Sequence, residues 1–198
     1  MSFYRDYAKG VLDVTAGIIL LILFFPIIFI SWLIASIDTK SNGFFLQSRI
    51  GKHGRPFKIF KIKTMYNPKG ERSSITADIT SDISYSGVVF RKYKLDEIPQ
   101  LINIALGQMS FVGPRPDVAG YADALKGDDR KVLLLRPGIT GPASIKYRNE
   151  EEILQNIEDK KNYNDYVIWP DKVKINKKYY EECSLLKDIY YVYKTIFK

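Results

Sequence analysis

The sequence predicts a helix-rich α+β protein, with one long apolar helix at the N-terminus and a small domain containing a short sheet after it. Three observations predict this class. No charged residue occurs from Val14 to Ile37. Apolar residues recur at helical spacing in segments 95–106 and 185–197. Strand-like alternation is confined to short stretches, which excludes a large doubly wound sheet. The length of 198 residues suits one domain with an additional element.

The amino-acid composition limits which partners and which kinds of site the protein can have. The chain has 30 Lys and Arg against 22 Asp and Glu, a formal net charge of +8. Such a charge favours anionic partners, namely nucleic acid, an anionic membrane surface or phosphorylated substrates. The single cysteine, Cys183, excludes an internal disulfide, and the single histidine, His53, excludes zinc sites that need several His or Cys ligands. Acid–base chemistry is therefore expected to fall to carboxylates.

The apolar segment is long enough to enter a membrane. A spanning helix needs about 20 apolar residues, whereas the apolar region of a signal peptide has about 7–15. Pro26, in its middle, removes one backbone hydrogen bond. Two forms are compatible with this: a kinked spanning helix, which composition alone favours, and a re-entrant helix that bends at Pro26 and exits on the side it entered. Basic residues on both flanks fit two cytoplasmic ends.

The next segments carry a basic region and a loop. Residues 40–63 contain Lys and Arg but no acid, which by itself indicates a juxtamembrane patch for anionic lipid. Alternation from Phe60 to Thr64 predicts a strand with Lys61 and Lys63 on one face. Residues 66–87 are polar and are interpreted as a loop.

Several helices are expected further on. The segment 95–106 is a predicted helix that stops at Gly107. Met109 to Val112 is a predicted strand, and Asp117 is expected to cap a helix through about Lys126. Residues 150–166 are expected to be helical. The segment 185–197 predicts an amphipathic helix with lysines opposite its apolar face, which fits docking on a core or on a membrane surface equally well.

The acid pair Asp96-Glu97 is a candidate for chemistry. It falls at or just before a predicted helix N-terminus, whose dipole would keep a carboxylate ionised. The alternative is that Asp96 is only an N-cap, which is common.

Two arginines lie in stiff loops. Arg115 lies between Pro114 and Pro116, which restrict the backbone and would lower the entropic cost of binding phosphate. The alternative is a rigid turn with an exposed arginine. Arg136 precedes Pro137 and Gly138, and the glycine would allow close approach of a ligand to the backbone.

Together these segments resemble the bacterial sugar transferases, also called monotopic phosphoglycosyl transferases, from about residue 5 to the end. The matching motifs are Arg49-Ile50-Gly51, Lys61-Ile62-Lys63-Thr64-Met65, Leu95 to Asn103, Gly107 to Pro116 and Arg136 to Gly141. The chain departs from the family at Ile62-Lys63, where Phe-Arg is frequent, and at Pro142-Ala143-Ser144. It resembles the small, minimal form of the family.

The resemblance implies transfer of a sugar phosphate from a UDP-sugar to polyprenol phosphate, with release of UMP. Asp96 would be the nucleophile, would form a covalent phosphosugar intermediate and would help to hold Mg²⁺, while Glu97 would support transfer to the acceptor. The resemblance also favours the re-entrant form at Pro26. The residues expected to hold substrate phosphates are Lys61, Arg91, Arg115 and Arg136, supported by the loop residues Pro114, Pro116, Gly138 and Thr140.

The implied organisation is a membrane-inserted helix-break-helix over residues 1–39 and a cytoplasmic catalytic domain over residues 40–198, at the bacterial inner membrane. Expected partners are the UDP-sugar, the polyprenol phosphate, the lipid bilayer and downstream glycosyltransferases, and no nucleic acid. Two other hypotheses stay open: a membrane-anchored module that binds anionic lipid or nucleic acid, and a catalytically inactive scaffold of the same fold. The sequence contains no readable code for the sugar.

Overall fold

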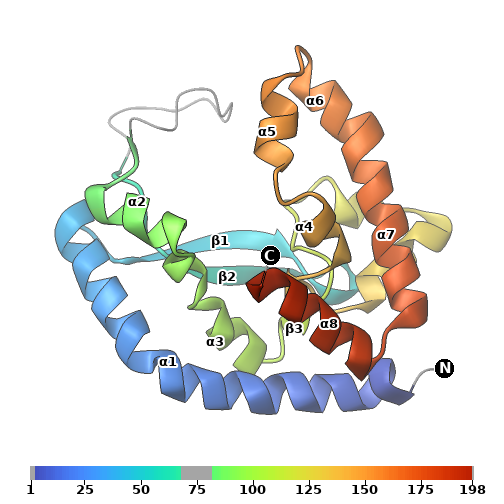
Figure 1. The fold of residues 1–198 in the computed structure, drawn as a ribbon, viewed down its shortest axis with the longest axis horizontal. Helices are drawn as coiled ribbons and strands as arrows, with labels where there is room; N and C mark the ends of the chain where they lie inside the picture. The colour runs from blue at the N-terminus through green and yellow to red at the C-terminus, as the bar shows by residue number, and fades with distance from the viewer. Residues whose placement is uncertain (1–2, 68–81, 198) are drawn as a thin grey trace. The chain divides into compact units, whose positions relative to one another are not determined.

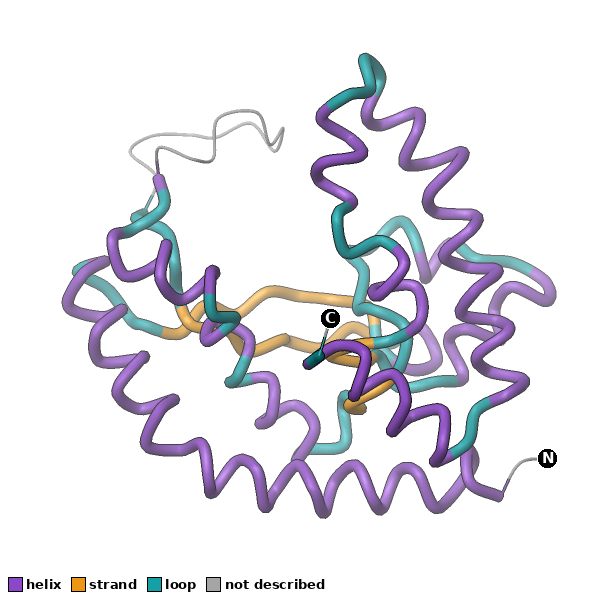
Figure 2. The backbone as a smooth tube through the Cα atoms, viewed as in Figure 1, coloured by secondary structure: helices purple, strands orange, loops and turns teal. Residues whose placement is uncertain are grey.

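The computed structural model describes residues 3–67 and 82–197. It confirms a helix-rich α+β fold, in which the strands of the described residues form two-stranded sheets (Figures 1 and 2). The chain divides into two compact units. Unit 1 consists of residues 1–15, 48–57 and 106–198, and unit 2 consists of residues 16–47 and 58–105.

The predicted apolar helix is α1, Lys9–Thr39. It runs through Pro26 without interruption and bends along its course (Figure 1), as expected where a proline removes a helical hydrogen bond. Large apolar side chains on it are exposed, such as Ile22 at 71% and Leu23 at 67%. The helix is long and apolar enough to cross a membrane. Its exposed apolar surface distinguishes it from the core helix of a soluble protein, which is mostly buried.

Unit 2 is built around the last turns of α1. Ala35, Ile62 and Phe90 are buried together, and Trp32, Phe44 and Leu95 pack against them. The strand predicted near Phe60 is confirmed as β2, Pro56–Ile62, which pairs with β1, Phe44–Ile50. Strand β1 was not predicted, because the basic region that contains it indicated lipid binding rather than a strand. Residues 68–81 of the predicted loop lie outside the described residues, and α2 begins at its end, Tyr85–Lys92.

The helix predicted over 95–106 is only partly confirmed. Leu95–Glu97 forms a 3₁₀ turn, and α3 covers Gln100–Ala105. The chain then turns at Gly107, whose φ of +70° favours glycine, as predicted.

Unit 1 contains the second sheet. The predicted strand is confirmed as β3, Ser110–Val112, which pairs in parallel with β4, Gly138–Thr140. Ser110 is opposite Gly138 and Val112 is opposite Thr140. The backbones approach closely just beyond β3, since a Cβ at Gly113 would come within 2.3 Å of the Arg136 carbonyl oxygen.

Helices make up most of the remainder of unit 1 (Figure 1). The prediction for 150–166 is confirmed in part. Helix α5 covers Glu150–Gln155, residues 156–159 are not helical, and α6, Lys160–Tyr163, is followed by a π-turn at Asn164–Ile168. The predicted C-terminal helix is α8, Leu185–Ile196, beside β3 and β4. The short α4, Pro142–Lys146, and α7, Trp169–Glu182, were not predicted.

The helix predicted from Asp117 to about Lys126 is wrong. This stretch contains only a 3₁₀ turn at Ala122–Ala124, and a second 3₁₀ segment follows at Gly127–Leu134. The backbone oxygen of Asp117 accepts a hydrogen bond from the Ile50 N–H at 2.9 Å, which fixes Asp117 against β1. Gly120 then adopts a φ of +99°, which is incompatible with a helix.

Candidate active site

The acid pair lies in a tight turn of unit 2. Helix α2 ends at Lys92, and Lys94 takes a left-handed conformation with a φ of +56°, so the chain reverses direction. The 3₁₀ turn Leu95–Glu97 follows, with Leu95 packed against the unit's core. This packing fixes the backbone of the acid pair on one side, while α3 continues from Gln100.

Asp96 is a half-buried carboxylate in this turn. Its Oδ1 atom is buried and has no hydrogen-bond partner. Burial, followed by repulsion from Glu97, raises the pKa of Asp96. Asp96 does not lie at the N-terminus of α3, which begins four residues later, and desolvation is the largest influence on its pKa.

An unsatisfied buried carboxylate oxygen costs free energy unless a proton or cation compensates it. Mg²⁺ prefers carboxylate, water and phosphate oxygens as ligands. The Oδ1 atom of Asp96 therefore fits the magnesium ligand that the resemblance implies. Among the described residues, no group of three or more His, Cys, Asp or Glu side chains could hold a metal, so waters and substrate phosphates would complete such a site.

Glu97 is paired with a strand residue of the same unit. The Nζ atom of Lys61, on β2, lies 3.1 Å from Glu97 Oε1. The two side chains are 21% and 17% exposed, so solvent screens the ion pair only partly. The structure thus brings Lys61, Asp96 and Glu97 together, and Lys61 lowers the pKa of Asp96 against the larger effects of burial and Glu97.

Arg91 serves a neighbouring contact in unit 2. It lies in the last turn of α2, and its Nε donates to Thr64 Oγ1 at 3.0 Å. This bond joins α2 to the residues that follow β2. Its proposed contact with substrate phosphate stays a prediction.

Arg115 belongs to unit 1. Its side chain is exposed, while Pro114 and Pro116 on either side are buried, so Arg115 projects from an anchored loop. Its contact with substrate phosphate stays a prediction. The Pro114 carbonyl accepts a bond from the Gly138 N–H at 2.7 Å, which ties this loop to β4.

Arg136 also belongs to unit 1, and it contacts the start of α1. Its Nη1 lies 3.4 Å from the Gly10 carbonyl oxygen. A Cβ at Gly10 would meet the guanidinium at 3.3 Å. Thr140, another predicted supporting residue, shares a 2.6 Å hydrogen bond with Thr195 of α8. Arg136 and Thr140 therefore hold helices in place, and phosphate binding by Arg136 stays a prediction.

A charged cluster around Asp117 was not predicted as a site. Burial raises the pKa of Asp117 to about 6, although Lys172, Arg49 and Arg115 act to lower it. Arg49 is also desolvated, and its pKa is lowered by burial and by Arg115. The only sequence signal was an acid next to the Pro-Arg-Pro motif, which indicated a helix cap instead.

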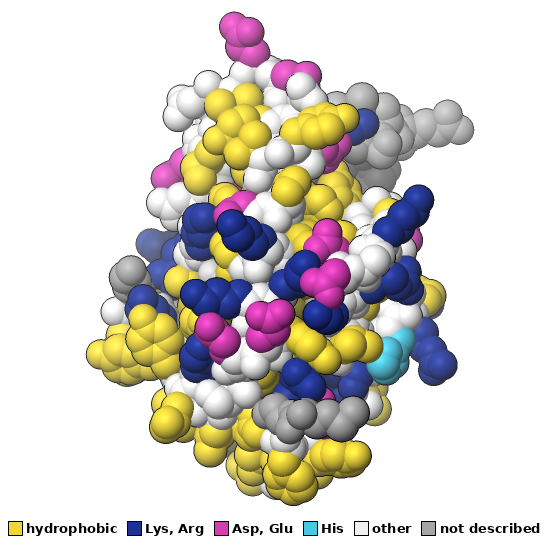
Figure 3. Space-filling model, turned by 90° about the vertical axis from the view of Figure 1, so that its right-hand side faces the viewer, with side chains coloured by type: hydrophobic (Ala, Val, Ile, Leu, Met, Phe, Trp, Pro, Cys, Tyr) yellow, Lys and Arg dark blue, Asp and Glu magenta, His cyan; other side chains and the backbone are white. Residues whose placement is uncertain are grey.

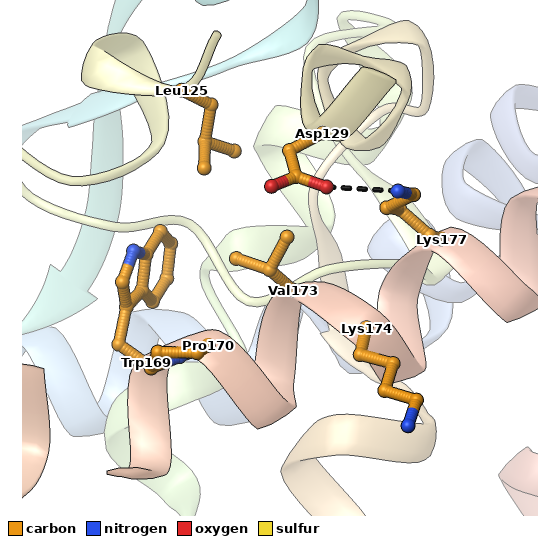
Figure 4. A pocket seen from close by; sticks show the side chains of 7 residues that line it. All are labelled: Leu125, Asp129, Trp169, Pro170, Val173, Lys174 and Lys177. Atoms are coloured by element: carbon orange, nitrogen blue, oxygen red, sulfur yellow. Dashed lines mark hydrogen bonds and ion pairs between the residues drawn. The ribbon is translucent and has the colours of Figure 1, made fainter. Parts of the chain in front are cut away.

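The hollow in Figure 4 is not centred on the acid pair. It has a volume of about 480 Å³ and lies in unit 1, against Leu125, Trp169 and Val173. Its Asp129 already pairs with Lys177 at 2.8 Å (Figure 4). The carboxylate with an unsatisfied oxygen, Asp96, belongs to unit 2.

Charge on the surface is mixed. On the face drawn in Figure 3, lysine and arginine side chains gather across the middle, with carboxylates among them. Lysines of the chain also pair with acids, as Lys177 does with Asp128 and Asp129.

A long exposed apolar helix and a half-buried carboxylate pair beside a lysine point to the class of membrane-associated enzymes. Comparison identifies the family. The model of the family described as bacterial sugar transferase matches residues 4–198. The chain therefore belongs to the bacterial sugar transferase family and is a transferase.

Individual relatives agree with this assignment. The chain is 31% identical over 205 residues to the exopolysaccharide production protein ExoY of Rhizobium meliloti (strain 1021), covering 96% of this chain and 84% of that protein. It is 35% identical over 141 residues to the uncharacterized sugar transferase EpsL of Bacillus subtilis (strain 168), covering 71% of this chain and 69% of that protein. It is 29% identical over 204 residues to the UDP-glucose:undecaprenyl-phosphate glucose-1-phosphate transferase of Escherichia coli (strain K12), covering 100% of this chain and 41% of that protein.

Proposed function

We propose that the protein transfers a sugar 1-phosphate from a UDP-sugar to a polyprenol phosphate, giving a polyprenol-diphosphate-sugar and UMP. The observation that carries the proposal is Asp96, a half-buried carboxylate with an unsatisfied oxygen beside the Lys61–Glu97 pair. The names of relatives support the substrate classes. The E. coli relative is named for UDP-glucose and undecaprenyl phosphate, and an Aeromonas hydrophila relative is named for UDP-N-acetylgalactosamine and undecaprenyl phosphate.

The proposed chemistry has two steps. A carboxylate oxygen of Asp96 attacks the β-phosphorus of the UDP-sugar, the bond from that phosphorus to the bridging α–β oxygen breaks, and UMP leaves with the electron pair. A phosphate oxygen of the polyprenol phosphate then attacks the same phosphorus, and the Asp96 carboxylate is released. Glu97 orients Lys61 toward the phosphates and supports entry of the acceptor phosphate.

A carboxylate can approach a diphosphate only if negative charge is neutralised. Mg²⁺, when bound, would supply Lewis-acid neutralisation of the phosphate oxygens. The chain's own contribution is Asp96 as ligand and nucleophile, with Lys61, which pairs with the adjacent Glu97, as the first candidate for the phosphates. Arg91, Arg115 and Arg136 are further candidates. Burial of Asp96 limits hydrolysis of the intermediate by water.

We further propose that α1 is re-entrant, so that both of its ends lie on the cytoplasmic face of the inner membrane. At its start, Lys9 pairs with Asp188 of α8 at 2.5 Å, and Asp13 accepts a bond from Ser110 of β3 at 2.6 Å. No second helix of the described residues is long and apolar enough to cross back. Because no further crossing by the described residues separates them, residues 110 and 188 lie on the same side of the membrane as the end of α1. The start of α1 packs against these residues and so lies on that side too.

The C-terminal helix is proposed to lie on the membrane surface. On α8, Leu186 is 79% exposed and Phe197, which follows the helix, is 69% exposed, so much of the apolar face predicted from sequence is not covered by protein. Tyr191 and Val192 pack against the core of unit 1 from the other side. An α8 lying on the membrane surface would hold unit 1 at the headgroups, the level at which a lipid-linked acceptor and downstream glycosyltransferases are reached.

Nucleotide release tests the proposed reaction. The purified protein in native-like bilayers, supplied with Mg²⁺ and polyprenol phosphate, is offered a panel of UDP-sugars. UMP is expected with at least one donor, and Asp96→Asn should abolish it, whereas Asp123→Asn in an exposed turn should retain activity. Release of UDP would instead indicate transfer of a bare sugar. Release of neither nucleotide across a broad panel would favour an inactive scaffold or an anionic-lipid-binding module.

A further inference from the structure

Asn103 of α3 contacts the backbone of β2 through its side chain. It is fully buried. Its Oδ1 accepts a hydrogen bond from the Phe60 N–H at 3.0 Å, and its Nδ2 donates to the Lys58 carbonyl at 2.8 Å. All these residues belong to unit 2. The amide group thereby satisfies one backbone donor and one backbone acceptor on the same edge of the strand.

The two bonds reproduce the pattern of a parallel β-ladder. In such a ladder, one residue donates to the carbonyl before its partner and accepts from the N–H after it. Lys58 and Phe60 flank the buried Ile59, so the Asn103 amide takes the place of a parallel strand residue opposite Ile59. Only one register of β2 against α3 satisfies both bonds, whereas apolar packing alone would tolerate small displacements.

The same two segments carry the paired residues of the acid site. Lys61 follows Phe60 directly on β2, and Glu97 lies in the turn ahead of α3, with Lys61 Nζ and Glu97 Oε1 3.1 Å apart. A lysine has a long, flexible side chain, so its position depends on how firmly its backbone is held. The two hydrogen bonds of the Asn103 side chain, here called the clamp, hold β2 close to this lysine. One is at Lys58, three residues before Lys61, and the other is at Phe60, one residue before it.

We propose that Asn103 is a positioning residue, which fixes the register of β2 and so sets Lys61 against Glu97 and the neighbouring Asp96. The catalytic consequence rests on the proposed phosphosugar transfer. An apolar residue at position 103 would leave the Phe60 N–H and the Lys58 carbonyl unsatisfied. An aspartate would keep an acceptor for Phe60 but lose the donor to Lys58.

The test is a double-mutant cycle with Lys61. Asn103→Leu and Asn103→Asp are each made alone and with Lys61→Met, and UMP release is measured as kcat and KM separately. Asn103→Leu is expected to lower kcat about tenfold or more in the wild-type background and by less than about threefold in Lys61→Met, a coupling within the range found for contacting residues. Asn103→Asp, which keeps the acceptor for Phe60, should show a smaller loss in the wild-type background and a correspondingly smaller coupling.

A matched control separates positioning from general loss of stability. Ile104, the next residue on α3, is fully buried and apolar. Ile104→Ala should destabilise the protein while lowering activity by the same factor with or without Lys61. Equal losses for Asn103→Leu in both backgrounds would overturn the positioning role.

Hydrogen exchange tests the clamp without using the reaction. Asn103→Leu is expected to speed amide exchange in peptides covering both 58–62 and 95–98, and Ile104→Ala should not single out these two segments. Unchanged exchange in 58–62 would overturn the proposal even in an active enzyme. If the wild type released no UMP from any donor, the proposed reaction would fail. Faster amide exchange in both segments of Asn103→Leu would still support the role of Asn103 in positioning β2.

Discussion

At the scale of single residues, the pKa of Asp96 reflects three neighbouring influences. Burial and Glu97 raise it, and Lys61 lowers it. The two charged neighbours, Glu97 and Lys61, can each be removed with a near-isosteric change, so their effects on the pKa can be separated experimentally.

We predict opposite shifts for the two neighbours in the metal-free protein. Lys61→Met should raise the pKa of Asp96, because a stabilising positive charge is lost. Glu97→Gln should lower it, because a repulsive charge is lost. Titration of the labelled Asp96 carboxyl by carbon-13 NMR measures both. Shifts of the same sign in the two variants would contradict the electrostatic account.

Asp117 provides a second prediction, on stability. Burial raises its pKa from 3.8 to about 6 in the folded protein. Between about pH 4 and pH 6 the unfolded chain therefore releases this proton first, and this group lowers the free energy of unfolding as the pH rises. The loss approaches about 3 kcal/mol above pH 6.

Asp117→Asn removes this titration. Relative to wild type, the variant should have a similar free energy of unfolding below pH 4 and a higher one above pH 6, as measured by unfolding at several pH values. Asp123→Asn, in an exposed turn, is the control, and its stability difference from wild type should depend little on pH. A stability difference for Asp117→Asn that is constant from pH 4 to pH 7 would rule out the raised pKa.

At the scale of elements, a buried polar network fixes the start of α1. Lys9 contacts Asp188 at 2.5 Å and Asp13 at 3.2 Å, and its side chain is 8% exposed. The hydroxyl of Tyr4 donates to Asp188 at 2.7 Å, and the hydroxyl of Tyr179 donates to the other oxygen of the same carboxylate. Removing the lysine would leave two buried carboxylates without their cation.

Lys9→Met is therefore expected to destabilise unit 1 by about 3–5 kcal/mol. The exposed Lys178, changed in the same way, should alter stability by less than about 0.5 kcal/mol. Thermal or denaturant unfolding in detergent compares the two. A negligible effect of Lys9→Met would show that the network does not hold α1.

The sequence predicted elements where local patterns decide the structure. The apolar helix, β2, β3 and α8 each follow a period or a length that is readable from residues alone. The helix from Asp117 was wrong because its evident cap binds a distant strand through Ile50. Strand β1 was missed because its basic residues had a competing explanation.

The candidate site shows the same limit. Asp96, Glu97 and Lys61 were predicted as site residues, and their proximity follows from the packing of β2 against α3, which no local pattern encodes. Asn103 was part of a recognised motif, but its role as a strand partner depends on a contact over 43 positions of sequence. The raised pKa of Asp96 likewise depends on tertiary burial.

At the scale of the whole molecule, the re-entrant path of α1 predicts where both ends lie. Single cysteines are introduced at Tyr7, which is 70% exposed, and at Lys178, in a Cys183→Ser background. An impermeant maleimide should label both positions in inverted membrane vesicles and neither in intact cells. Labelling of Tyr7→Cys from outside the cell, with Lys178→Cys protected, would indicate a spanning helix.

If Asp96 becomes covalently bonded to the phosphosugar, mass spectrometry can detect the adduct. The wild type is incubated with Mg²⁺ and its UDP-sugar, without polyprenol phosphate, and the intact protein and its peptides are weighed. We predict one equivalent of UMP and an added sugar phosphate on the peptide that contains Asp96, absent in Asp96→Asn and lost when polyprenol phosphate is added. UMP release that requires the acceptor, with no adduct under any condition, would contradict the account and indicate direct transfer.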